Sequence, residues 1–315
     1  MKIVILDAEM IGKDIPFDGF LSLGEVIIHD FSTPAEIPER IRDAEVILTN
    51  KCRLSGDILA AAPRLKLILE AATGFDNIDV EYCRNHGVGV CNVKGYSSPS
   101  VATLTTAMAL GLLCHLNEYD AYCRSGDYTR SGKFNLLAPP YSEAEGKTWG
   151  IVGMGDIGRR VAAVAKALGC EVVCFQRHPD AEYPTLSLEE LIRRSDIISL
   201  HVPLNDGTRG MIGEKELSLL KPGAILINMA RGPVVDEEAV ARALAENRLG
   251  GFGCDVFSIE PFPEDHPYQK IKTLPNVILT PHMAWGSIEA RRRLMNEMQE
   301  NLCAFLRGER RNRID

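Results

Sequence analysis

Three ionisable residues in the second half of the chain each follow a short apolar run that predicts a β-strand: Arg231, Glu260 and His282. Ligands of open α/β sheets bind beyond the carboxyl ends of the strands, so these side chains could converge at one site. Reduction of a carbonyl would use all three. An imidazole gives the proton, a carboxylate beside it stabilises the charged ring, and a guanidinium binds a substrate carboxylate. Taken singly, they have structural explanations too: a charge at a helix start, a turn residue and a loop histidine.

A glycine-rich segment follows another apolar run and reads Gly153-Met154-Gly155-Asp156-Ile157-Gly158. A tight strand-to-helix turn alone could use this spacing. In a dinucleotide site, the first glycine permits the turn, the second lets a pyrophosphate approach the backbone, and the third lets helix and strand pack closely. The helix N-terminus then faces the anion. Because the segment lies between a predicted strand and a predicted helix, it indicates a dinucleotide site.

The end of the next predicted strand bears on the choice of cofactor. An NAD site usually has an acidic residue there, which binds the adenosine ribose hydroxyls. This chain has Gln176-Arg177-His178 instead. A guanidinium could pair with a 2′-phosphate, whereas a carboxylate would repel it, so the sequence slightly favours NADP(H) over NAD(H). The alternative is that Arg177 is a solvated loop charge and NAD(H) is used.

Length and composition restrict the class of protein. With 315 residues, the chain is long enough for about two domains. Its 45% hydrophobic and 25% charged residues are typical of a globular protein, and its net charge of −8 argues against a partner bound through nucleic-acid phosphates. Nine cysteines lack metal-ligand spacing, which indicates reduced, mostly buried thiols of a cytoplasmic protein and no metal site. No segment has the pattern of a signal peptide or a membrane span.

Short runs rich in Val and Ile alternate with helix-length segments along the whole chain, which predicts an α/β protein with parallel sheets. In the first part the expected strands are 2–6, 26–29, 46–49, 67–70 and 88–91, with helices over 34–42, 55–62 and 79–86 and Gly87 at the last helix end. A second alternation has strands at 148–152, 171–175, 197–201, 224–229, 251–256 and 277–280. Further helices are expected over 99–124 and 287–306 and after a capping Ser187, and 125–146 is rich in turn residues.

Several segments of the chain resemble the D-isomer-specific 2-hydroxyacid dehydrogenases, over essentially its whole length. They are 71–79 (AATGFDNID), 153–158, 217–232, 253–257 with Glu260-Pro261, and 281–284 (PHMA). The resemblance implies two doubly wound parallel-sheet domains with a cleft between them. A flavodoxin-like substrate-binding domain would contain 1–97 and 287–315, and a Rossmann NAD(P)-binding domain would contain 98–286. It also implies a homodimer through the second domain.

The same resemblance assigns roles to individual residues. Arg231 orients the substrate, His282 donates the proton and Glu260 is its carboxylate partner. The backbone of Ala72, Thr73 and Gly74 holds the substrate carboxylate, a use of oriented N–H groups that needs small residues. Lys51 and Trp285 are further substrate-binding residues. The cofactor-binding residues would be Thr73, Gly153, Met154, Gly155, Asp156, Ile157, Gly158, Gln176, Arg177, Val202, Pro203, Thr208, Met229, Ala230 and Asp255.

Within the family, the chain resembles the glycerate dehydrogenase or hydroxypyruvate reductase branch in three places: Thr49-Asn50-Lys51, Asn92-Val93 with Gly95-Tyr96-Ser97, and Ala284-Trp285. Glu70 stands where phosphoglycerate enzymes of the family tend to carry arginine, which disfavours a phosphorylated substrate. The expected activity is the reduction of hydroxypyruvate, and of glyoxylate, to D-glycerate or glycolate. Two features depart from the family pattern: Gln176 replaces the usual acid, and 136–143 matches no familiar segment.

Two other functions are open on this sequence. The first is a D-2-hydroxyacid dehydrogenase that acts on another aliphatic 2-oxo acid. The second is a non-catalytic NAD(H) sensor that works by binding partners, as corepressors of the same fold do, although those proteins typically carry long extensions. The fold alone does not distinguish these functions, so the choice between them depends on the residues of the site.

Overall fold

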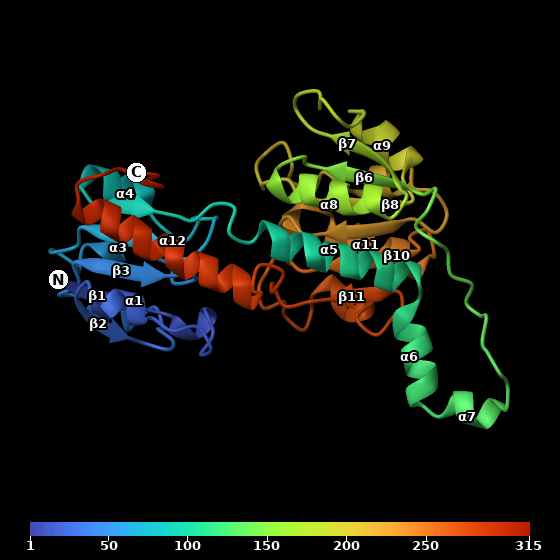
Figure 1. Cartoon of the computed structure of the whole chain (residues 1–315), viewed down its shortest axis with the longest axis horizontal. Coiled ribbons are helices and arrows are strands. Elements are labelled where there is room, and N and C mark those ends of the chain that lie inside the picture. The colour runs from blue at the N-terminus through green and yellow to red at the C-terminus, as the bar shows by residue number, and fades with distance from the viewer. The chain divides into compact units, whose positions relative to one another are not determined.

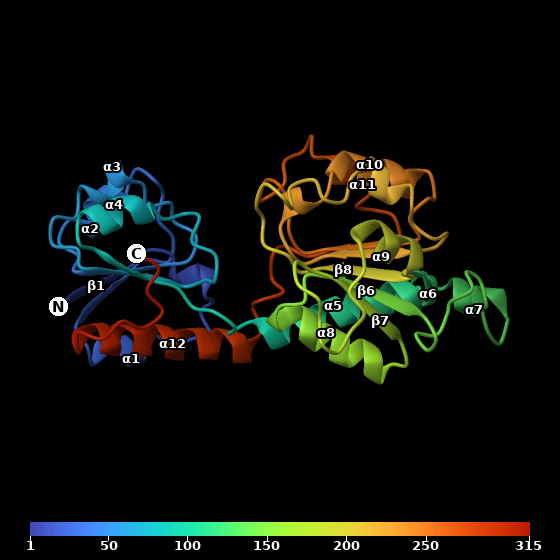
Figure 2. The same cartoon turned by 90° about the horizontal axis from the view of Figure 1, so that it is seen from above.

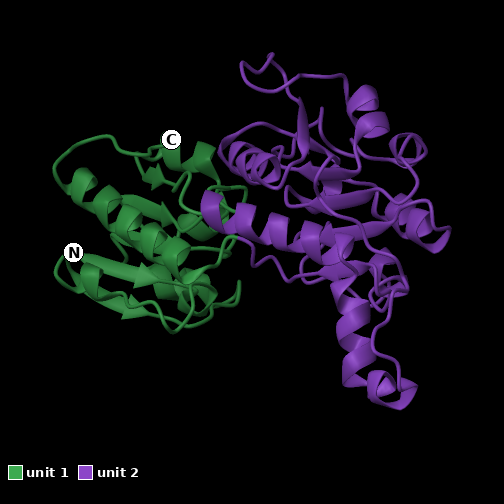
Figure 3. Cartoon of the chain, turned by 45° about the vertical axis from the view of Figure 1, so that its right-hand side comes forward, with its two compact units in different colours: residues 1–97, 285–315 green, residues 98–284 purple.

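The structure, a computed structural model, describes residues 1–315 and divides into two compact units (Figure 3). Unit 1 consists of residues 1–97 and 285–315, and unit 2 of residues 98–284. Each unit has one parallel sheet with helices on both faces, so the predicted α/β class with two doubly wound sheets is confirmed. The later boundary falls at 284–285 rather than at 286–287.

Unit 1 is built on a five-stranded sheet with the order β2-β1-β3-β4-β5. Neighbouring strands are parallel, and Ile3 lies opposite Val26 on one side and Val46 on the other. The central strands are runs of Val, Ile and Leu that are almost completely buried, as expected for a sheet covered on both faces. The five strands are β1 (Lys2–Ile5), β2 (Glu25–Ile28), β3 (Val46–Thr49), β4 (Leu67–Glu70) and β5 (Gly89–Cys91).

Helices lie on both faces of this sheet (Figure 2). A buried apolar cluster fills the space on each face. In one layer, Phe20 of α1 and Leu294 of α12 pack with Ile3 of β1. In the other, Ile41 of α2 and Cys83 of α4 belong to the same buried cluster. The helices of unit 1 are η1 (Ala8–Met10), α1 (Asp18–Leu21), α2 (Ile37–Ile41), α3 (Gly56–Leu59), α4 (Val80–Asn85) and α12 (Ile288–Leu306).

Unit 2 is built on a six-stranded parallel sheet with the order β11-β10-β9-β8-β6-β7. The chain enters at β6, adds β7 on one side and then crosses to β8 on the other. The winding direction therefore reverses between β6 and β8, which is where ligands of such sheets bind. The strands are β6 (Thr148–Val152), β7 (Glu171–Phe175), β8 (Ile197–Leu200), β9 (Ile225–Asn228), β10 (Gly251–Cys254) and β11 (Val277–Leu279).

Helices α5 and α8 cover one face of this sheet, and α9, α10 and α11 cover the other (Figures 1 and 2). On the α5 side, the fully buried indole of Trp149 donates a hydrogen bond from Nε1 to Oγ of Ser199 at 3.0 Å. The helices of unit 2 are α5 (Ser98–Leu113), α6 (Leu116–Arg124), α7 (Asp127–Ser131), α8 (Asp156–Ala167), α9 (Leu188–Arg194), α10 (Glu214–Leu217), η2 (Gly232–Val234), α11 (Glu237–Ala245) and η3 (Pro267–Lys270).

The prediction of one continuous helix over 99–124 is wrong. The structure has two helices, α5 and α6, which meet at a bend of 66°. His115 lies between them with φ +52°, a left-handed conformation that ends α5. Helix α5 packs against β9 and β10 and is buried along much of its length, whereas α6 has no buried residue. The break thus lies where the chain leaves the apolar face of the sheet, and α6 and α7 extend away from it (Figure 1).

The bend also bears on membrane insertion. No single helix is long and apolar enough to cross a bilayer, and only the bent pair of α5 and α6 together reaches the required length and composition.

Other local predictions are confirmed. Ser187 caps α9 by accepting a hydrogen bond from the Glu190 amide at 3.2 Å. Gly87 follows α4 with φ +69°, a left-handed conformation that costs glycine little. All nine cysteines are free thiols, and six of them are buried, so the interpretation as mostly buried thiols holds.

Candidate active site

The turn between β6 and α8 has the geometry that the glycine spacing predicts. Gly153 has φ +98°, and its amide donates to the carbonyl of Phe175 at 2.9 Å. A Cβ on Gly158 would lie 2.2 Å from the Gly153 carbonyl oxygen, so helix and turn approach too closely for a side chain. A Cβ on Gly155 would meet nothing within 4 Å, so the space at the N-terminus of α8 is open. Such an open helix N-terminus fits the pyrophosphate of a dinucleotide.

The end of β7 carries a carboxylate that the sequence analysis missed. Nε2 of Gln176 donates to Oδ2 of Asp180 at 3.2 Å, and Arg159 pairs with the same oxygen at 2.6 Å. The Glu182 amide and the Arg159 guanidinium lower the pKa of Asp180 to about 2. Arg177, the residue expected to bind a 2′-phosphate, is exposed. An acid therefore exists near the expected place, four positions later in the chain, and its charge is already paired.

The loop after β8 contains three of the predicted cofactor-binding residues, Val202, Pro203 and Thr208. The Thr208 hydroxyl donates to the Pro203 carbonyl at 2.6 Å and accepts from the Asn205 amide at 2.9 Å, so it shapes its own loop. His201 precedes them with both ring nitrogens buried and without a hydrogen-bond partner. Burial lowers the pKa of His201 to about 3, so its ring is neutral near pH 7.

The predicted cofactor-binding residues differ in how much of their surface is exposed. A residue with a buried side chain can still bind a ligand through its backbone. A residue with an exposed side chain can bind through its backbone and its side chain. Asp156 and Pro203 are exposed, Ile157 and Val202 are half-buried, and Met154, Met229 and Ala230 are buried.

Arg231 follows β9, and a buried asparagine fixes its backbone. Nδ2 of Asn228 donates to the Arg231 carbonyl at 3.0 Å, while Oδ1 of Asn228 accepts from the Ala230 amide at 3.0 Å. The guanidinium of Arg231 is half-buried and donates from Nη1 to the Ala230 carbonyl at 2.8 Å. Asn228 was missed by the sequence analysis, although a polar residue ending an otherwise apolar strand is a recognisable signal.

Glu260 and His282, which follow β10 and β11, are in direct contact. Oε2 of Glu260 lies 2.6 Å from Nδ1 of His282, and Oε1 accepts a hydrogen bond from the Phe257 amide at 2.9 Å. With Nδ1 held by the carboxylate, Nε2 is the ring nitrogen that can meet a ligand. The structure thus brings together two of the three residues expected to do chemistry, and Arg231 lies at the end of the adjacent strand β9.

Asp255 shapes the loop that carries His282. Its buried carboxylate accepts hydrogen bonds from the Thr280 hydroxyl at 2.6 Å and from the amides of Met283 and Ala284, both at 2.9 Å. His282 itself has φ +51°, which residues other than glycine adopt rarely, so these bonds hold a strained loop. Burial raises the pKa of Asp255, and the three hydrogen bonds oppose that shift. Asp255, which was predicted to bind the cofactor, therefore has this additional structural role.

The segment 71–74 of unit 1 is fixed from both sides by asparagine side chains. Nδ2 of Asn50 donates to the Ala71 carbonyl at 2.6 Å, and Nδ2 of Asn92 donates to the Thr73 carbonyl at 2.7 Å. The Thr73 hydroxyl donates to the Val93 carbonyl at 2.7 Å. These contacts use carbonyls and the hydroxyl of the segment, and they hold its backbone in one conformation. Gly74 and Ala72 are half-buried, and Thr73 is exposed.

Lys51, another predicted substrate residue, lies on a turn that an acid organises. Asp7, two residues after the end of β1, accepts from the amides of Lys51 at 2.7 Å and Cys52 at 3.1 Å. Lys51 is exposed, and Glu70 behind it is completely buried. Burial raises the pKa of Glu70 well above its usual range, while a hydrogen bond from Asn77 opposes the shift. Trp285 is half-buried and contacts Tyr96 edge-on, with ring centroids 6.3 Å apart.

With this geometry established, comparison with known proteins decides the family. Residues 106–284 match the family model described as "D-isomer specific 2-hydroxyacid dehydrogenase, NAD binding domain". The chain belongs to the D-isomer specific 2-hydroxyacid dehydrogenase family. As a member of that family it is an oxidoreductase that uses a nicotinamide cofactor, and unit 2 contains the matched domain.

Curated members of this dehydrogenase family resemble the chain over most of its length. A glycerate dehydrogenase from Methylorubrum extorquens is 38% identical over 283 residues, which is 90% of this chain and 89% of that protein. A hydroxypyruvate reductase from Blautia hydrogenotrophica is 32% identical over 317 residues, which is 98% of each. The predicted resemblance to the glycerate dehydrogenase or hydroxypyruvate reductase branch is confirmed by these relatives.

Solved structures of dehydrogenases and related reductases share the whole fold. An acyclic imino acid reductase in complex with NADPH and D-Arg has a TM-score of 0.87 and 31% identity, with 100% of both chains covered. A D-lactate dehydrogenase from Aquifex aeolicus complexed with NAD and lactic acid has a TM-score of 0.86 and 31% identity, with 98% of this chain and 96% of that chain covered.

Proposed function

We propose that this dehydrogenase reduces hydroxypyruvate to D-glycerate and glyoxylate to glycolate, with NADP(H) slightly preferred over NAD(H). The observation that carries the proposal is the 2.6 Å contact between Nδ1 of His282 and Oε2 of Glu260, at the strand ends where Arg231 also lies. The relatives named glycerate dehydrogenase and hydroxypyruvate reductase support the choice of substrate.

In this proposal His282 is the proton donor. Glu260 holds Nδ1, so Nε2 gives its proton to the carbonyl oxygen of the substrate. The carboxylate also stabilises the imidazolium before the transfer and keeps the ring in one orientation. The bound nicotinamide supplies the hydride for the carbonyl carbon. Asp255 keeps the His282 loop in place through its three hydrogen bonds.

In unit 2, Arg231 is proposed to bind the substrate carboxylate. A guanidinium can hold a carboxylate with two parallel hydrogen bonds, and it also polarises an adjacent carbonyl. In unit 1, the amides of Ala72, Thr73 and Gly74 are proposed to offer oriented N–H groups to a carboxylate. Lys51 and Trp285 are proposed to contact the rest of the substrate. A Gly74→Val substitution should therefore weaken substrate affinity, because a branched side chain would cover these amides.

The preference for NADP(H) rests on the end of β7. An acid that binds the ribose hydroxyls would repel a 2′-phosphate, but here Gln176 occupies that position and Asp180 is neutralised by Arg159. Arg177 is exposed and adjacent to Gln176, so it could pair with the phosphate. Complexes of similar structures contain NADPH in one case and NAD in another, and both cofactors occur on this fold.

We also propose a homodimer formed through unit 2. Helix α6, helix α7 and the following segment expose large apolar side chains, among them Leu116 at 56%, Phe134 at 94% and Leu137 at 75%. Clustered exposed apolar residues mark interaction surfaces. Sedimentation at micromolar concentration should show a dimer, and a Phe134→Asp variant should shift it toward the monomer. A wild-type protein that sediments only as a monomer would contradict this part of the proposal.

The test of the function is an assay of cofactor oxidation by the purified protein. Hydroxypyruvate, glyoxylate, pyruvate and longer 2-oxo acids are compared with NADH and NADPH in parallel. Hydroxypyruvate should give the highest kcat/KM, and His282→Ala should abolish turnover, whereas a change of the exposed His86, which follows α4, to alanine should not alter turnover. Highest efficiency with another 2-oxo acid would overturn the substrate assignment, and cofactor binding without any turnover would favour a sensor.

A further inference from the structure

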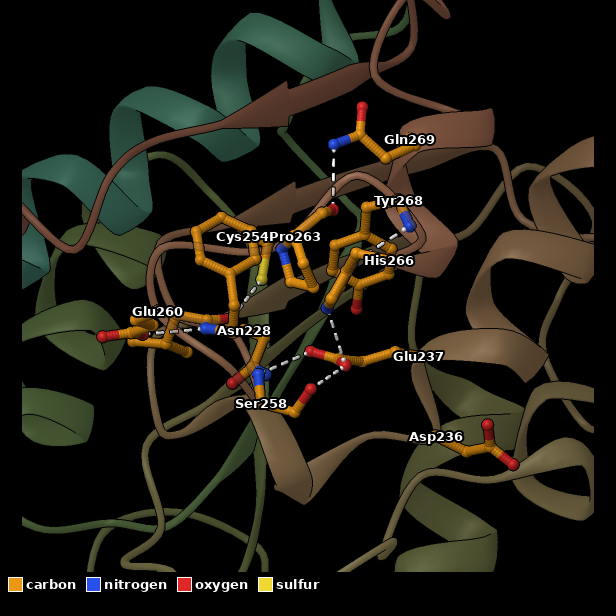
Figure 4. A network of polar contacts seen from close by, with 12 residues as sticks. Asn228, Asp236, Glu237, Cys254, Ser258, Glu260, Pro263, His266, Tyr268 and Gln269 are labelled. Carbon is orange, nitrogen blue, oxygen red and sulfur yellow. Dashed lines mark hydrogen bonds and ion pairs between the residues drawn. The ribbon is translucent and has the colours of Figure 1, made fainter.

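A second glutamate, Glu237, is connected to Glu260 through the Phe257–Ser258 peptide and uses both of its oxygens (Figure 4). It is the first residue of α11 and only 8% exposed. Oε1 accepts from the Ser258 amide at 2.9 Å. Oε2 accepts from the Ser258 hydroxyl and lies 3.0 Å from Nε2 of His266. The two Ser258 hydrogen bonds and the nearby imidazole offset the cost of burying this carboxylate, so they hold it in one position.

The tautomer of His266 follows from its neighbours. Nδ1 accepts a hydrogen bond from the Tyr268 amide at 3.2 Å, so that nitrogen carries no proton. The ring proton is therefore on Nε2, which lies 3.0 Å from Oε2 of Glu237. The ring also packs against Phe262, with centroids 5.1 Å apart. His266 thus lies against one Glu237 oxygen and limits the space into which that oxygen can move.

The peptide between Phe257 and Ser258 connects this cluster to the proposed catalytic residues. The Phe257 amide donates to Glu260, the carboxylate that holds His282, and the next amide, of Ser258, donates to Glu237. Two consecutive amides are thus held by two carboxylates. Displacement of this peptide would move the Phe257 amide, which donates a hydrogen bond to Glu260.

The same peptide also supports the backbone beside Arg231. A Cβ on Gly232 would lie 2.0 Å from the carbonyl carbon of Phe257 and 2.2 Å from the Ser258 nitrogen. The residue that follows Arg231 is therefore in tight contact with the peptide that Glu237 holds. A shift of this peptide would therefore change the positions of both Arg231 and Glu260.

We propose that Glu237, held by His266, is a positioning residue for catalysis: it holds the Phe257–Ser258 peptide and thereby sets the placement of Glu260, His282 and Arg231. This inference rests on the proposed function. Glu237 acts through the peptide and does not touch substrate or cofactor. Small displacements of a general acid reduce turnover far more than they reduce cofactor binding, because proton transfer depends on geometry.

The test compares Glu237→Gln with Glu238→Gln. Glu237→Gln replaces one of the two acceptor oxygens by an NH2 donor, so the side chain cannot accept from the Ser258 amide with one oxygen and from the Ser258 hydroxyl with the other. Glu238 is 53% exposed and pairs only with Lys270, at 3.7 Å. Glu237→Gln should lower kcat about 10- to 100-fold and leave the dissociation constant for the cofactor within about twofold. Glu238→Gln should match the wild type. Equal kcat in the two variants would overturn the proposal.

A double variant separates positioning from general damage. If Glu237 acts through Glu260, the loss in Glu237→Gln/Glu260→Gln should be clearly smaller than the product of the single losses. A loss of kcat in the double variant equal to the product of the two single losses would overturn the proposal. Where Glu237→Gln does not fold, Ser258→Ala removes only one hydroxyl donor to the carboxylate and should lower kcat in the same direction, about threefold. An unchanged kcat in Ser258→Ala would then count against the proposal.

A spectroscopic readout works without turnover. The proton between Nδ1 of His282 and Glu260 should appear far downfield in the proton spectrum, since the bond is short and charge-assisted. Its resonance should move or broaden in Glu237→Gln and stay unchanged in Glu238→Gln. If the wild type turned over no 2-oxo acid but this resonance still moved, the proposed function would fail and the positioning link would stand. A resonance unchanged in both variants would overturn the link.

Discussion

Nδ1 of His282 and Oε2 of Glu260 lie 2.6 Å apart, although 22 positions separate the two residues in the sequence. The contact forms because β10 and β11 are neighbouring parallel strands, so the loops that leave their carboxyl ends meet at one edge of the sheet. The carboxylate fixes the orientation of the ring, which is what the proposed general-acid role of His282 needs.

Glu260→Gln should lower turnover because it changes the partner of Nδ1 of His282. An amide can present either its oxygen or its NH2 group to that nitrogen, so it no longer fixes the ring in one orientation as the carboxylate does. In the proposed mechanism kcat for 2-oxo acid reduction should decrease about 10- to 100-fold, and the dissociation constant for the cofactor should stay within about twofold of the wild-type value. Steady-state kinetics and fluorescence titration provide the measurements, and an unchanged kcat would contradict the role of Glu260.

Arg231→Lys should impair the use of the substrate more than it weakens binding of the cofactor. A lysine keeps the charge but cannot form two parallel hydrogen bonds to a carboxylate, so kcat/KM for the 2-oxo acid should fall by about 100-fold or more. Cofactor affinity, measured by fluorescence titration, should stay within about twofold of the wild-type value. Arg193→Lys on the exposed surface of α9 is the matched control and should behave like the wild type. Equal losses of substrate and cofactor affinity would indicate misfolding around β9 instead.

Cofactor choice should depend on Arg177 and Gln176. Arg177→Ala should raise the KM for NADPH about tenfold and leave the KM for NADH nearly unchanged, because only the 2′-phosphate needs the guanidinium. Gln176→Asp should favour NADH, since an acid there binds the ribose hydroxyls and repels the phosphate. Steady-state kinetics with both cofactors provide the measurement. An Arg177→Ala variant with unaltered KM for NADPH would favour the alternative that this arginine is a solvated charge.

His201 should make the folded protein sensitive to acid. Its pKa is lowered to about 3 by burial, whereas in the unfolded chain a histidine has a pKa of about 6.5. The unfolded chain therefore binds the proton first. The stability that the neutral ring provides is complete above about pH 6.5 and is lost as the pH falls toward 3. At pH 5 the loss amounts to about 2 kcal/mol at most.

Urea unfolding at pH 7.5 and pH 5 tests this expectation. The free energy of unfolding should fall less in His201→Gln than in the wild type, whereas the exposed His178→Gln should keep the wild-type pH dependence. Identical pH dependence in all three proteins would contradict the expectation for His201.

Thiol labelling should distinguish the cysteines by burial. Burial raises the pKa of Cys52 to about 12 and that of Cys83 and Cys91 to about 11, so at pH 8 at most about one molecule in a thousand carries the reactive thiolate at each. Cys123 is exposed and should react first with iodoacetamide. Peptide mapping of the folded protein gives the order of labelling, with urea-unfolded protein as the reference in which all nine react. Early labelling of Cys52 in the folded protein would contradict the burial argument.

Local features of this protein were predictable from the sequence because their physical cause is local. The glycines at 153, 155 and 158 mark a turn that needs a left-handed residue and close helix packing. Runs of Val and Ile mark strands that are buried on both faces. Arg231, Glu260 and His282 could be predicted as a set because each follows such a run, and parallel strands end at the same edge of a sheet.

Only the tertiary structure decided how distant residues support this set. The contacts of Asp255 with Thr280 and Met283, and of Glu237 with Ser258, depend on the order and register of strands, which hydrophobic periodicity does not encode. The break at His115 depends on where the apolar face of the sheet ends, a property of the packed unit and not of the helix itself. The residue types that can do the chemistry are thus readable from local spacing, whereas the contacts that hold them in place are long-range and arise only when the strands pair.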